Sequence, residues 1–141
     1  MTWLVERLAD LRRHLDHLDG LRPRVTGPEV LDGDLSLHND VLFSLLTVCQ
    51  LVIDIAAELA GRRGERFEDY TEAIRRLAAD PRFPAELVKQ LVPLAGFRNI
   101  LIPEYVALDM ARVVEAMDRL VPIRHFVDIV AAVEQESDTS D

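Results

Sequence analysis

Three polar side chains, Arg98, Asn99 and Tyr105, lie in the otherwise largely apolar stretch from Leu94 to Tyr105. Burying an unpaired polar group is costly, so each of these side chains should either hydrogen-bond to another group or belong to a functional site. The planar guanidinium of an Arg suits the oxygens of a phosphate, which is the chemistry we consider for Arg98. The structural alternative is an interior ion pair between Arg98 and Asp54 or another acid.

The neighbouring residues have structural alternatives of the same kind. Asn99 would either cap a helix end or hold Arg98, and Tyr105 would either pack near a turn or belong to a site. The side chain of Pro103 has no donor, acceptor or titratable group, so it cannot act as a general acid or base. Asp54, the other polar residues of the long apolar segment 36–60, and Glu104 are candidate polar residues of the same cleft. For the residues of 36–60 a wetted groove or a dimer seam is an equal alternative.

Prolines divide the chain around this stretch. An interior proline removes a backbone hydrogen bond, so Pro93 predicts a kink or two abutting helices, over 84–92 and 93–102. Pro103 should help to end the second helix, and 103–108 should form a turn. Asp109 is placed to cap a last helix that continues to Val133 and bends at Pro122.

The earlier chain predicts further helices. Leucines recur at alternating spacings of four and three residues from Leu4 to Leu18, which is one helical face, and Gly20 is placed to end that helix. Residues 21–35 contain prolines and glycines and should form a loop. A short helix is expected over 67–79, with Phe67, Tyr70, Ile74 and Leu77 inward. The chain shows no strand-like alternation, which predicts an all-α fold of four to five antiparallel helices.

Residues 36–60 form the most apolar segment. Polar residues recur along it every three or four positions. The two carboxylates near its middle or far end, Asp54 and Glu58, would be expensive inside a membrane, so we expect no membrane span. A helix that is apolar on most sides must be covered on most sides. We therefore expect a homodimer that buries part of this helix.

Composition limits the remaining choices. The net charge of −9 argues against a general nucleic-acid binder, although residues 134–141 carry four of the acids and leave −5 on residues 1–133. We expect 1–133 to form one helical domain and 134–141 to be an acidic, disordered tail. The single Cys49 allows no disulfide within the chain, and with no secretory signal visible we expect a cytoplasmic protein.

The stretch around Arg98 resembles the signature of the HepT-like HEPN family, Phe-Arg-Asn-x-x-x-His-x-Tyr. Arg98, Asn99 and Tyr105 match it, whereas Pro103 stands at the position of the His. The order of a leucine-rich first helix, a long apolar helix, a Tyr-x-x-Ala-Ile segment at 70–74 and a closing helix after Asp109 is also similar to that family. The resemblance implies an antiparallel HEPN-type bundle.

The resemblance also implies a function. HepT-like proteins are toxins of toxin–antitoxin modules and metal-independent endoribonucleases that need no cofactor. They are homodimers whose two signature segments face each other, and their partner is a minimal nucleotidyltransferase (MNT) that in some pairs adenylylates the signature Tyr. By this likeness Arg98 and Asn99 belong to the catalytic group, Pro103 occupies the position of the catalytic His, and Tyr105 is the residue modified by the partner.

Pro103 leaves open whether the chain is an enzyme. One hypothesis is a ribonuclease toxin with RNA as substrate; loss of the proton-transfer group then predicts absent or much reduced cleavage. The alternative is a catalytically degenerate HEPN dimer that acts as a regulatory partner of a nucleotidyltransferase. A third is a plain helical interaction protein. His14, His17 and His125 are expected at the surface, and His38, at the start of the long helix, is the one to compare with the missing His.

Overall fold

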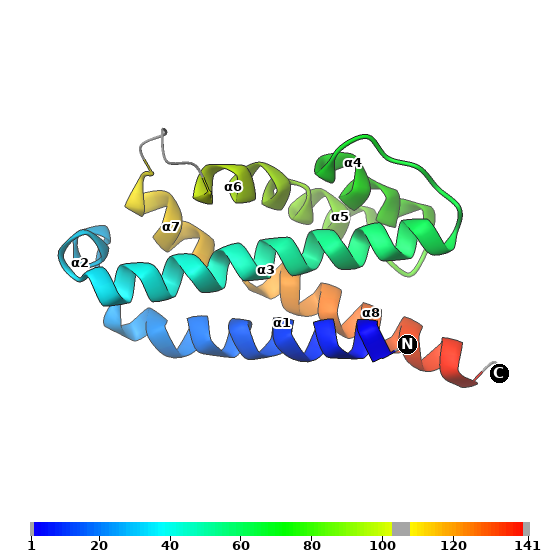
Figure 1. Cartoon of the computed structure of the whole chain (residues 1–141), viewed down its shortest axis with the longest axis horizontal. Helices are drawn as coiled ribbons and strands as arrows, with labels where there is room; N and C mark the ends of the chain where they lie inside the picture. Colours follow the sequence, from blue (N-terminus) through cyan, green and yellow to red (C-terminus); the bar gives the residue numbers. More distant parts are fainter. Residues whose placement is uncertain (1, 103–107, 140–141) are drawn as a thin grey trace.

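The computed structural model describes residues 2–102 and 108–139, and every regular element in these ranges is a helix (Figure 1). The order is α1 (Thr2–Leu21), η1 (Arg22–Arg24), α2 (Pro28–Gly33), α3 (Leu35–Arg62), α4 (Tyr70–Arg75), η2 (Arg76–Ala79), α5 (Ala85–Leu91), α6 (Pro93–Leu101), α7 (Met110–Met117) and α8 (Val121–Thr139). The predicted all-α class is confirmed. The expected number of four to five helices is wrong, because caps and prolines divide several expected helices into shorter ones.

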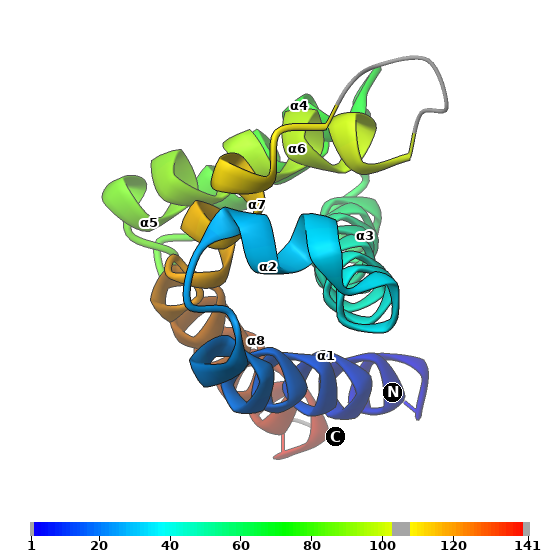
Figure 2. The same cartoon turned by 90° about the vertical axis from the view of Figure 1, so that its left-hand side faces the viewer.

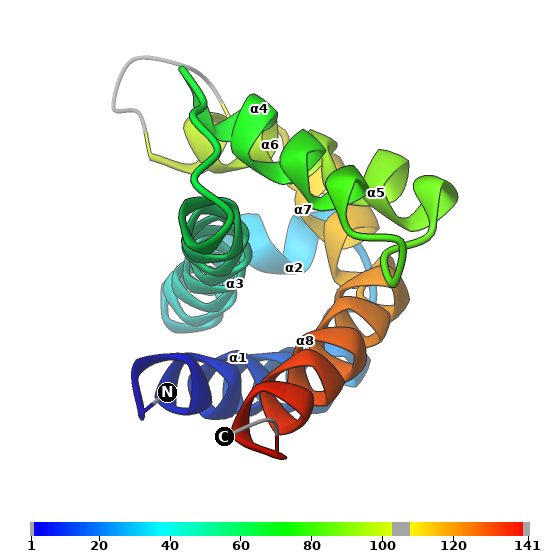
Figure 3. The same ribbon diagram turned by 90° about the vertical axis from the view of Figure 1, so that its right-hand side faces the viewer.

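The core lies between three groups of helices. Viewed end-on, α1 and α8 form one side, α3 a second, and α4, α5 and α6 a third (Figures 2 and 3). The predicted leucine face of α1 is confirmed, since Leu4, Leu8, Leu11, Leu15 and Leu18 are all buried. Phe126 of α8 and Ile74 of α4 are fully buried in the same core.

The long apolar helix runs as α3 from Leu35 to Arg62, slightly beyond the predicted 36–60. Asp34 caps it by accepting a hydrogen bond from the Leu37 amide at 3.1 Å. After its end, Gly64 adopts φ +72, a left-handed conformation that suits glycine. By length and composition α3 would pass as a membrane span, but 56% of its apolar window is buried within the bundle. That it is no span stays a prediction.

Two predicted breaks are found where the prolines stand. Val92 separates α5 from α6, and Pro93 occupies the first turn of α6, where its missing N–H costs nothing. Asp109 caps α7 as predicted, accepting from the Ala111 amide at 2.9 Å. The last helix is divided outright into α7 and α8, with Pro122 in the first turn of α8.

Two other expectations need correction. The loop expected over 21–35 contains η1 and α2, since Pro28 starts a short helix after Gly27. The helix expected over 67–79 begins only at Tyr70, because Asp69 caps it by accepting from the Glu72 amide at 2.8 Å, and it tightens into η2 after Arg75. Tyr70 is 39% exposed, so its predicted inward position is wrong.

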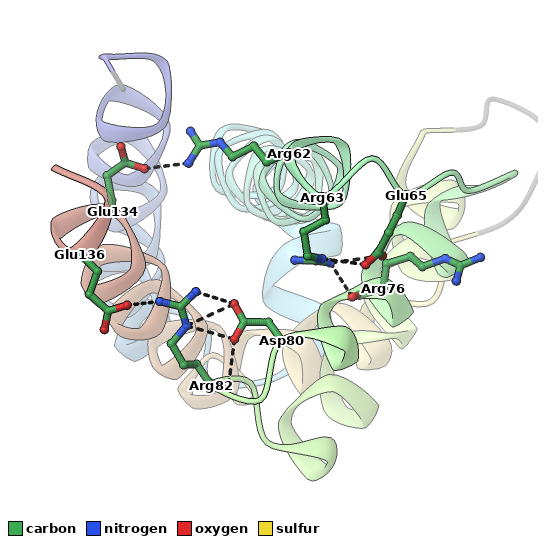
Figure 4. A network of polar contacts seen from close by, with 8 residues as sticks. All are labelled: Arg62, Arg63, Glu65, Arg76, Asp80, Arg82, Glu134 and Glu136. Atoms are coloured by element: carbon green, nitrogen blue, oxygen red, sulfur yellow. Dashed lines mark hydrogen bonds and ion pairs between the residues drawn. The ribbon is translucent and has the colours of Figure 1, made fainter. Parts of the chain in front are cut away.

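The expected tail from Glu134 is helical up to Thr139. Glu134 is buried and accepts from Arg62 at the end of α3 at 3.3 Å, while Glu136 pairs with Arg82 in the turn before α5 (Figure 4). Arg82 also pairs with Asp80 at 2.8 Å. These contacts hold Glu134 and Glu136 against the bundle, so residues 134–139 continue the last helix, and residues 140–141 of the predicted tail lie outside the described residues.

Candidate functional site

Arg98 lies on α6, which packs alongside α3 (Figures 1 and 2). Its Nε donates a hydrogen bond to Oε1 of Gln50 on α3 at 2.8 Å. Its Nη1 donates to Oδ1 of Asn99 at 3.1 Å. Of the two alternatives for Asn99, the structure therefore shows it holding Arg98. The two contacts fix the plane of the guanidinium from both sides.

Gln50 connects Arg98 to Asp54. The Gln50 side chain donates from Nε2 to Oδ1 of Asp54 at 2.8 Å, one helical turn further along α3. The predicted proximity of Asp54 to Arg98 is thus indirect. Within the described residues, Arg98 forms no ion pair with a carboxylate. Its Nε donates to the amide of Gln50, and Asp54 accepts from that amide and not from Arg98. Among the residues that the structure describes, the charge of Arg98 is thus positioned without being neutralised.

Tyr70 completes the surroundings of Arg98. The guanidinium carbon of Arg98 lies 5.1 Å from the centre of the Tyr70 ring, a cation–π contact. Tyr70 is the first residue of α4, so the Asp69 cap that starts this helix also places the ring. Tyr70 was not predicted as a site residue, and Gln50 was predicted only as one of the polar residues along the long helix, without a contact to Arg98. The signal for Gln50 was its position four residues before Asp54 on the polar stripe of α3.

Shallow hollows flank Arg98 on two sides. One, of about 280 Å³, is lined by Leu46, Thr47, Gln50, Leu51, Arg98 and Ile102. The other, of about 450 Å³, is lined by Glu68, Asp69, Tyr70, Thr71, Ala95 and Asn99. Large apolar side chains stand exposed on the α3 and α6 surface, with Phe43 63% and Ile102 47% exposed. Arg98 therefore lies at the edge of an apolar surface that the described residues leave uncovered.

Pro103, Glu104 and Tyr105 lie outside the described residues, so their predicted roles stay predictions. The nearby Cys49 is buried, which raises the pKa of its thiol to about 12 although the charge of Arg98 opposes the shift. A thiol with that pKa is protonated at neutral pH and is a poor nucleophile. Among residues 2–102 and 108–139, no group of three or more His, Cys, Asp or Glu is arranged to hold a metal ion.

The histidines make their contacts elsewhere. Nδ1 of His14 lies 3.0 Å from Oγ of Ser44, and Nε2 of His17 lies 2.8 Å from Asp40, both between α1 and α3. Nδ1 of His38 lies 3.1 Å from the carbonyl of Leu31. Burial, followed by the charge of Arg13, lowers the pKa of His14 from 6.5. His14 is thus less exposed than expected, and these contacts do not place the three histidines beside Arg98.

The sequence and the fold of this chain are similar to those of known proteins. A relative from Archaeoglobus fulgidus named "Putative RNase" is 27% identical over 110 residues, which make up 77% of this chain and 83% of that protein. Tri-AMPylated Shewanella oneidensis HEPN toxin, solved in complex with MNT antitoxin, superposes with a TM-score of 0.79 at 21% identity, over 92% of this chain and 96% of that chain.

A second solved structure, of the toxin–antitoxin MntA-HpeT mutant, gives a TM-score of 0.78 at 21% identity, over 94% of this chain and 99% of that chain. At these identities the likeness concerns the fold. The family model described as "Ribonuclease HepT-like" matches residues 6–130, from the first helix to the last. Because this match spans most of the sequence, the chain belongs to the HepT-like ribonuclease family.

Proposed function

We propose that this chain is the HepT-like toxin component of a HEPN/MNT toxin–antitoxin module, with its ribonuclease activity much reduced by Pro103. The observation that carries the proposal is the setting of Arg98. Gln50 and Asn99 occupy two of the five guanidinium N–H donors, and no carboxylate of the described residues neutralises the charge. Three of its N–H donors have no partner in the described part of the chain and are proposed to bind the oxygens of a phosphate.

Arg98 would act on RNA by electrostatic stabilisation. Attack of the 2′-OH on the neighbouring phosphate develops negative charge on the phosphate oxygens, and a fixed guanidinium offers its N–H donors to that charge. The Tyr70 ring and the Gln50 amide hold the guanidinium before substrate arrives, so little reorganisation is needed. The net charge of −9 makes this local cation more important, since the mean field of the molecule repels RNA.

The family signature places a His for proton transfer, and this chain lacks that His. The position that holds His in the family signature holds Pro103, whose side chain can neither accept nor donate a proton. Loss of a proton-transfer group costs about 10²–10⁴-fold in rate. The contacts of His14, His17 and His38 favour structural roles for them over substitution for that group.

A homodimer is part of the proposal. On a helix, positions five apart point about 140° away from each other, so Arg98 and position 103 converge on one substrate most simply if two subunits share the site. The exposed Phe43 and Ile102 and the hollow beside Arg98 support an interface on the α3 and α6 surface. A second copy placed there would bring two Arg98 side chains to one cleft.

The proposed antitoxin is an MNT nucleotidyltransferase in the same cytoplasm, with Tyr105 as the target of adenylylation. Support comes from the Shewanella oneidensis HEPN toxin, which is AMPylated and in complex with an MNT antitoxin. Tyr105 matches the tyrosine of the family signature.

The test compares RNA cleavage by the purified natural chain, by Pro103→His, and by Pro103→His combined with Arg98→Gln. We expect weak cleavage by the natural chain, a gain of about 10²-fold or more with the histidine, and loss of that gain without Arg98. Robust cleavage by the natural chain would overturn the proposed impairment. In parallel, co-expression with a neighbouring nucleotidyltransferase should add the mass of adenylyl groups, and Tyr105→Phe should remain unmodified.

A second candidate function is a degenerate HEPN dimer that only binds or regulates the nucleotidyltransferase. Pro103 is the observation that favours it, because the Arg98 contacts persist without a proton-transfer residue. The same experiment separates the two. A chain that copurifies with the nucleotidyltransferase while Pro103→His stays inactive on RNA would support the degenerate protein.

A further inference from the structure

A separate cavity of about 240 Å³ lies between α3, α6 and the turn from α7 into α8. Its floor is apolar and buried, formed by Leu45, Val48, Cys49, Leu120 and Ile123. Cavities that hold drug-sized ligands measure about 300–1,000 Å³, so this one suits a smaller molecule. An apolar floor of this kind favours an aliphatic or aromatic group over water.

The mouth of the cavity is polar and holds two arginines with different surroundings. Nη2 of Arg119 pairs with Oε1 of Glu115 at 2.5 Å, one helical turn away. Arg112 lines the same cavity, and its guanidinium has no hydrogen bond or ion pair with the residues that the structure describes. Above the apolar floor, the mouth therefore holds Arg119, which is paired with Glu115, and Arg112, which has no side-chain partner among the described residues.

We propose that this cavity binds a small amphipathic carboxylate, with its hydrocarbon part on the floor and its carboxylate on Arg112. The floor removes apolar surface from water, while Arg112 pairs with a carboxylate in the geometry that guanidinium groups favour. Gln90, at the same mouth, adds an amide that can donate to the second carboxylate oxygen.

This site is distinct from the surroundings of Arg98. Leu94 and Phe97 of α6 line the cavity, whereas Arg98 on the same helix contacts Gln50, and the hollow beside Arg98 shares none of the cavity's residues. Binding here can therefore be tested without RNA or a nucleotidyltransferase. Its outcome is independent of the proposed function.

The test is a calorimetric titration of the full chain with octanoate, with octanol as the uncharged probe of the same length. We expect saturable binding of octanoate, and affinity lower by about tenfold for octanol and for Arg112→Gln. Arg119→Gln is the matched control, because Arg119 is already paired with Glu115, and it should bind within about twofold of the natural chain. Ala116→Leu, which adds bulk to the cavity wall, should weaken binding further.

Cys49 provides a second readout, because it lines the cavity and is the sole cysteine of the chain. Bound octanoate should slow its modification by a thiol reagent, and it should do so less in Arg112→Gln. The proposal is overturned if octanoate gives no saturable heat, or if octanol and octanoate bind equally well. It is also overturned if Arg112→Gln binds as tightly as the natural chain while circular dichroism shows both to be folded.

Discussion

Gln50 and Arg98 are 48 residues apart in the sequence and are joined by a hydrogen bond of 2.8 Å between Oε1 and Nε. The same amide donates to Asp54 at 2.8 Å, so its orientation is fixed from the other side. An acid at position 50 would neutralise Arg98, whereas an amide orients it and leaves its charge available. Gln50 is therefore a positioning residue for the cation of the candidate site.

Gln50→Met should weaken RNA binding. Methionine keeps the length of the side chain but gives Arg98 no acceptor, so the guanidinium loses one of its two fixed hydrogen bonds. A hydrogen bond of this kind contributes about 1 kcal/mol, which corresponds to about fivefold in affinity. Fluorescence anisotropy with a short single-stranded RNA, at one fixed salt concentration, measures the change.

Thr47→Val is the matched control for Gln50→Met. Thr47 lines the same hollow, but its hydroxyl donates to the carbonyl of Phe43 at 2.8 Å and has no contact with Arg98. Its RNA affinity should stay within about twofold of the natural chain, in line with the small effect of most surface substitutions. If both variants lost RNA affinity equally, the loss would come from a change in the hollow and not from the hydrogen bond between Gln50 and Arg98.

The pair Arg62–Glu134 should respond unequally to removal of either partner. The Glu134 side chain is 4% exposed, and its Oε1 has no hydrogen-bond partner among residues 2–102 and 108–139. The Arg62 side chain is 30% exposed and also lies 3.5 Å from Glu58. Arg62→Met leaves a buried carboxylate unpaired and should lower the free energy of unfolding by about 3 kcal/mol. Glu134→Met removes the buried charge itself and should change it by less than about 1 kcal/mol.

Urea unfolding followed by circular dichroism measures both changes, with Glu58→Gln as control. Glu58 is more exposed than Glu134, so its loss should cost less than about 0.5 kcal/mol. If Glu134→Met were as destabilising as Arg62→Met, the ion pair would be a net stabilising contact and the unequal response would be wrong.

Asp69→Ala should destabilise α4 and move Tyr70. Asp69 accepts from the Glu72 amide at 2.8 Å, and Glu72 in turn accepts from the Glu68 amide at 3.2 Å. Losing such a cap costs about 1 kcal/mol of the free energy of unfolding, whereas Asp69→Asn keeps a capping oxygen and should cost about half as much or less. Urea unfolding measures the first part. Tyrosine fluorescence measures the second in a background of Trp3→Phe and Tyr105→Phe, where Tyr70 is the sole tyrosine.

Local patterns predicted much of this fold. The spacing of Leu4 to Leu18 predicted a buried helical face, Pro93 predicted a break, and Asp109 predicted a cap, because each depends on neighbours within a few residues. The end of the last helix could not be predicted in this way. Glu134 is held by Arg62, 72 residues earlier, and nothing near Glu134 in the sequence indicates that partner.

In the candidate site, too, the residues marked by local sequence were predicted, whereas contacts between distant parts of the chain were not. Arg98 and Asn99 were identified because they interrupt an apolar stretch and match a family signature. The contacts of Gln50 and Tyr70 with Arg98 were not predicted, because they depend on how α3 and α4 pack against α6. Prediction from the sequence placed Asp54 near Arg98, but the intervening Gln50 amide determines that the contact is indirect.

His14 should make stability depend on pH in a defined window. Burial, followed by Arg13, lowers the pKa of His14 from 6.5 in the folded protein. The unfolded chain then binds more protons than the folded protein as pH falls below 6.5, so the free energy of unfolding should decrease there. The stability from neutral His14 is fully present above pH 6.5 and is lost as pH falls through the lowered pKa.

Urea unfolding at pH 7.5 and pH 5.5 tests this. The pKa values of Asp80 and Asp118 are lowered from 3.8, so these two carboxylates stay ionised at both pH values and do not contribute to the difference. His14→Gln, which can still bond to Ser44, should lose less stability between the two pH values than the natural chain. His125→Gln is the matched control, since His125 is exposed on α8, and it should lose as much as the natural chain. A loss in His14→Gln equal to that of the natural chain would assign the pH dependence to another group.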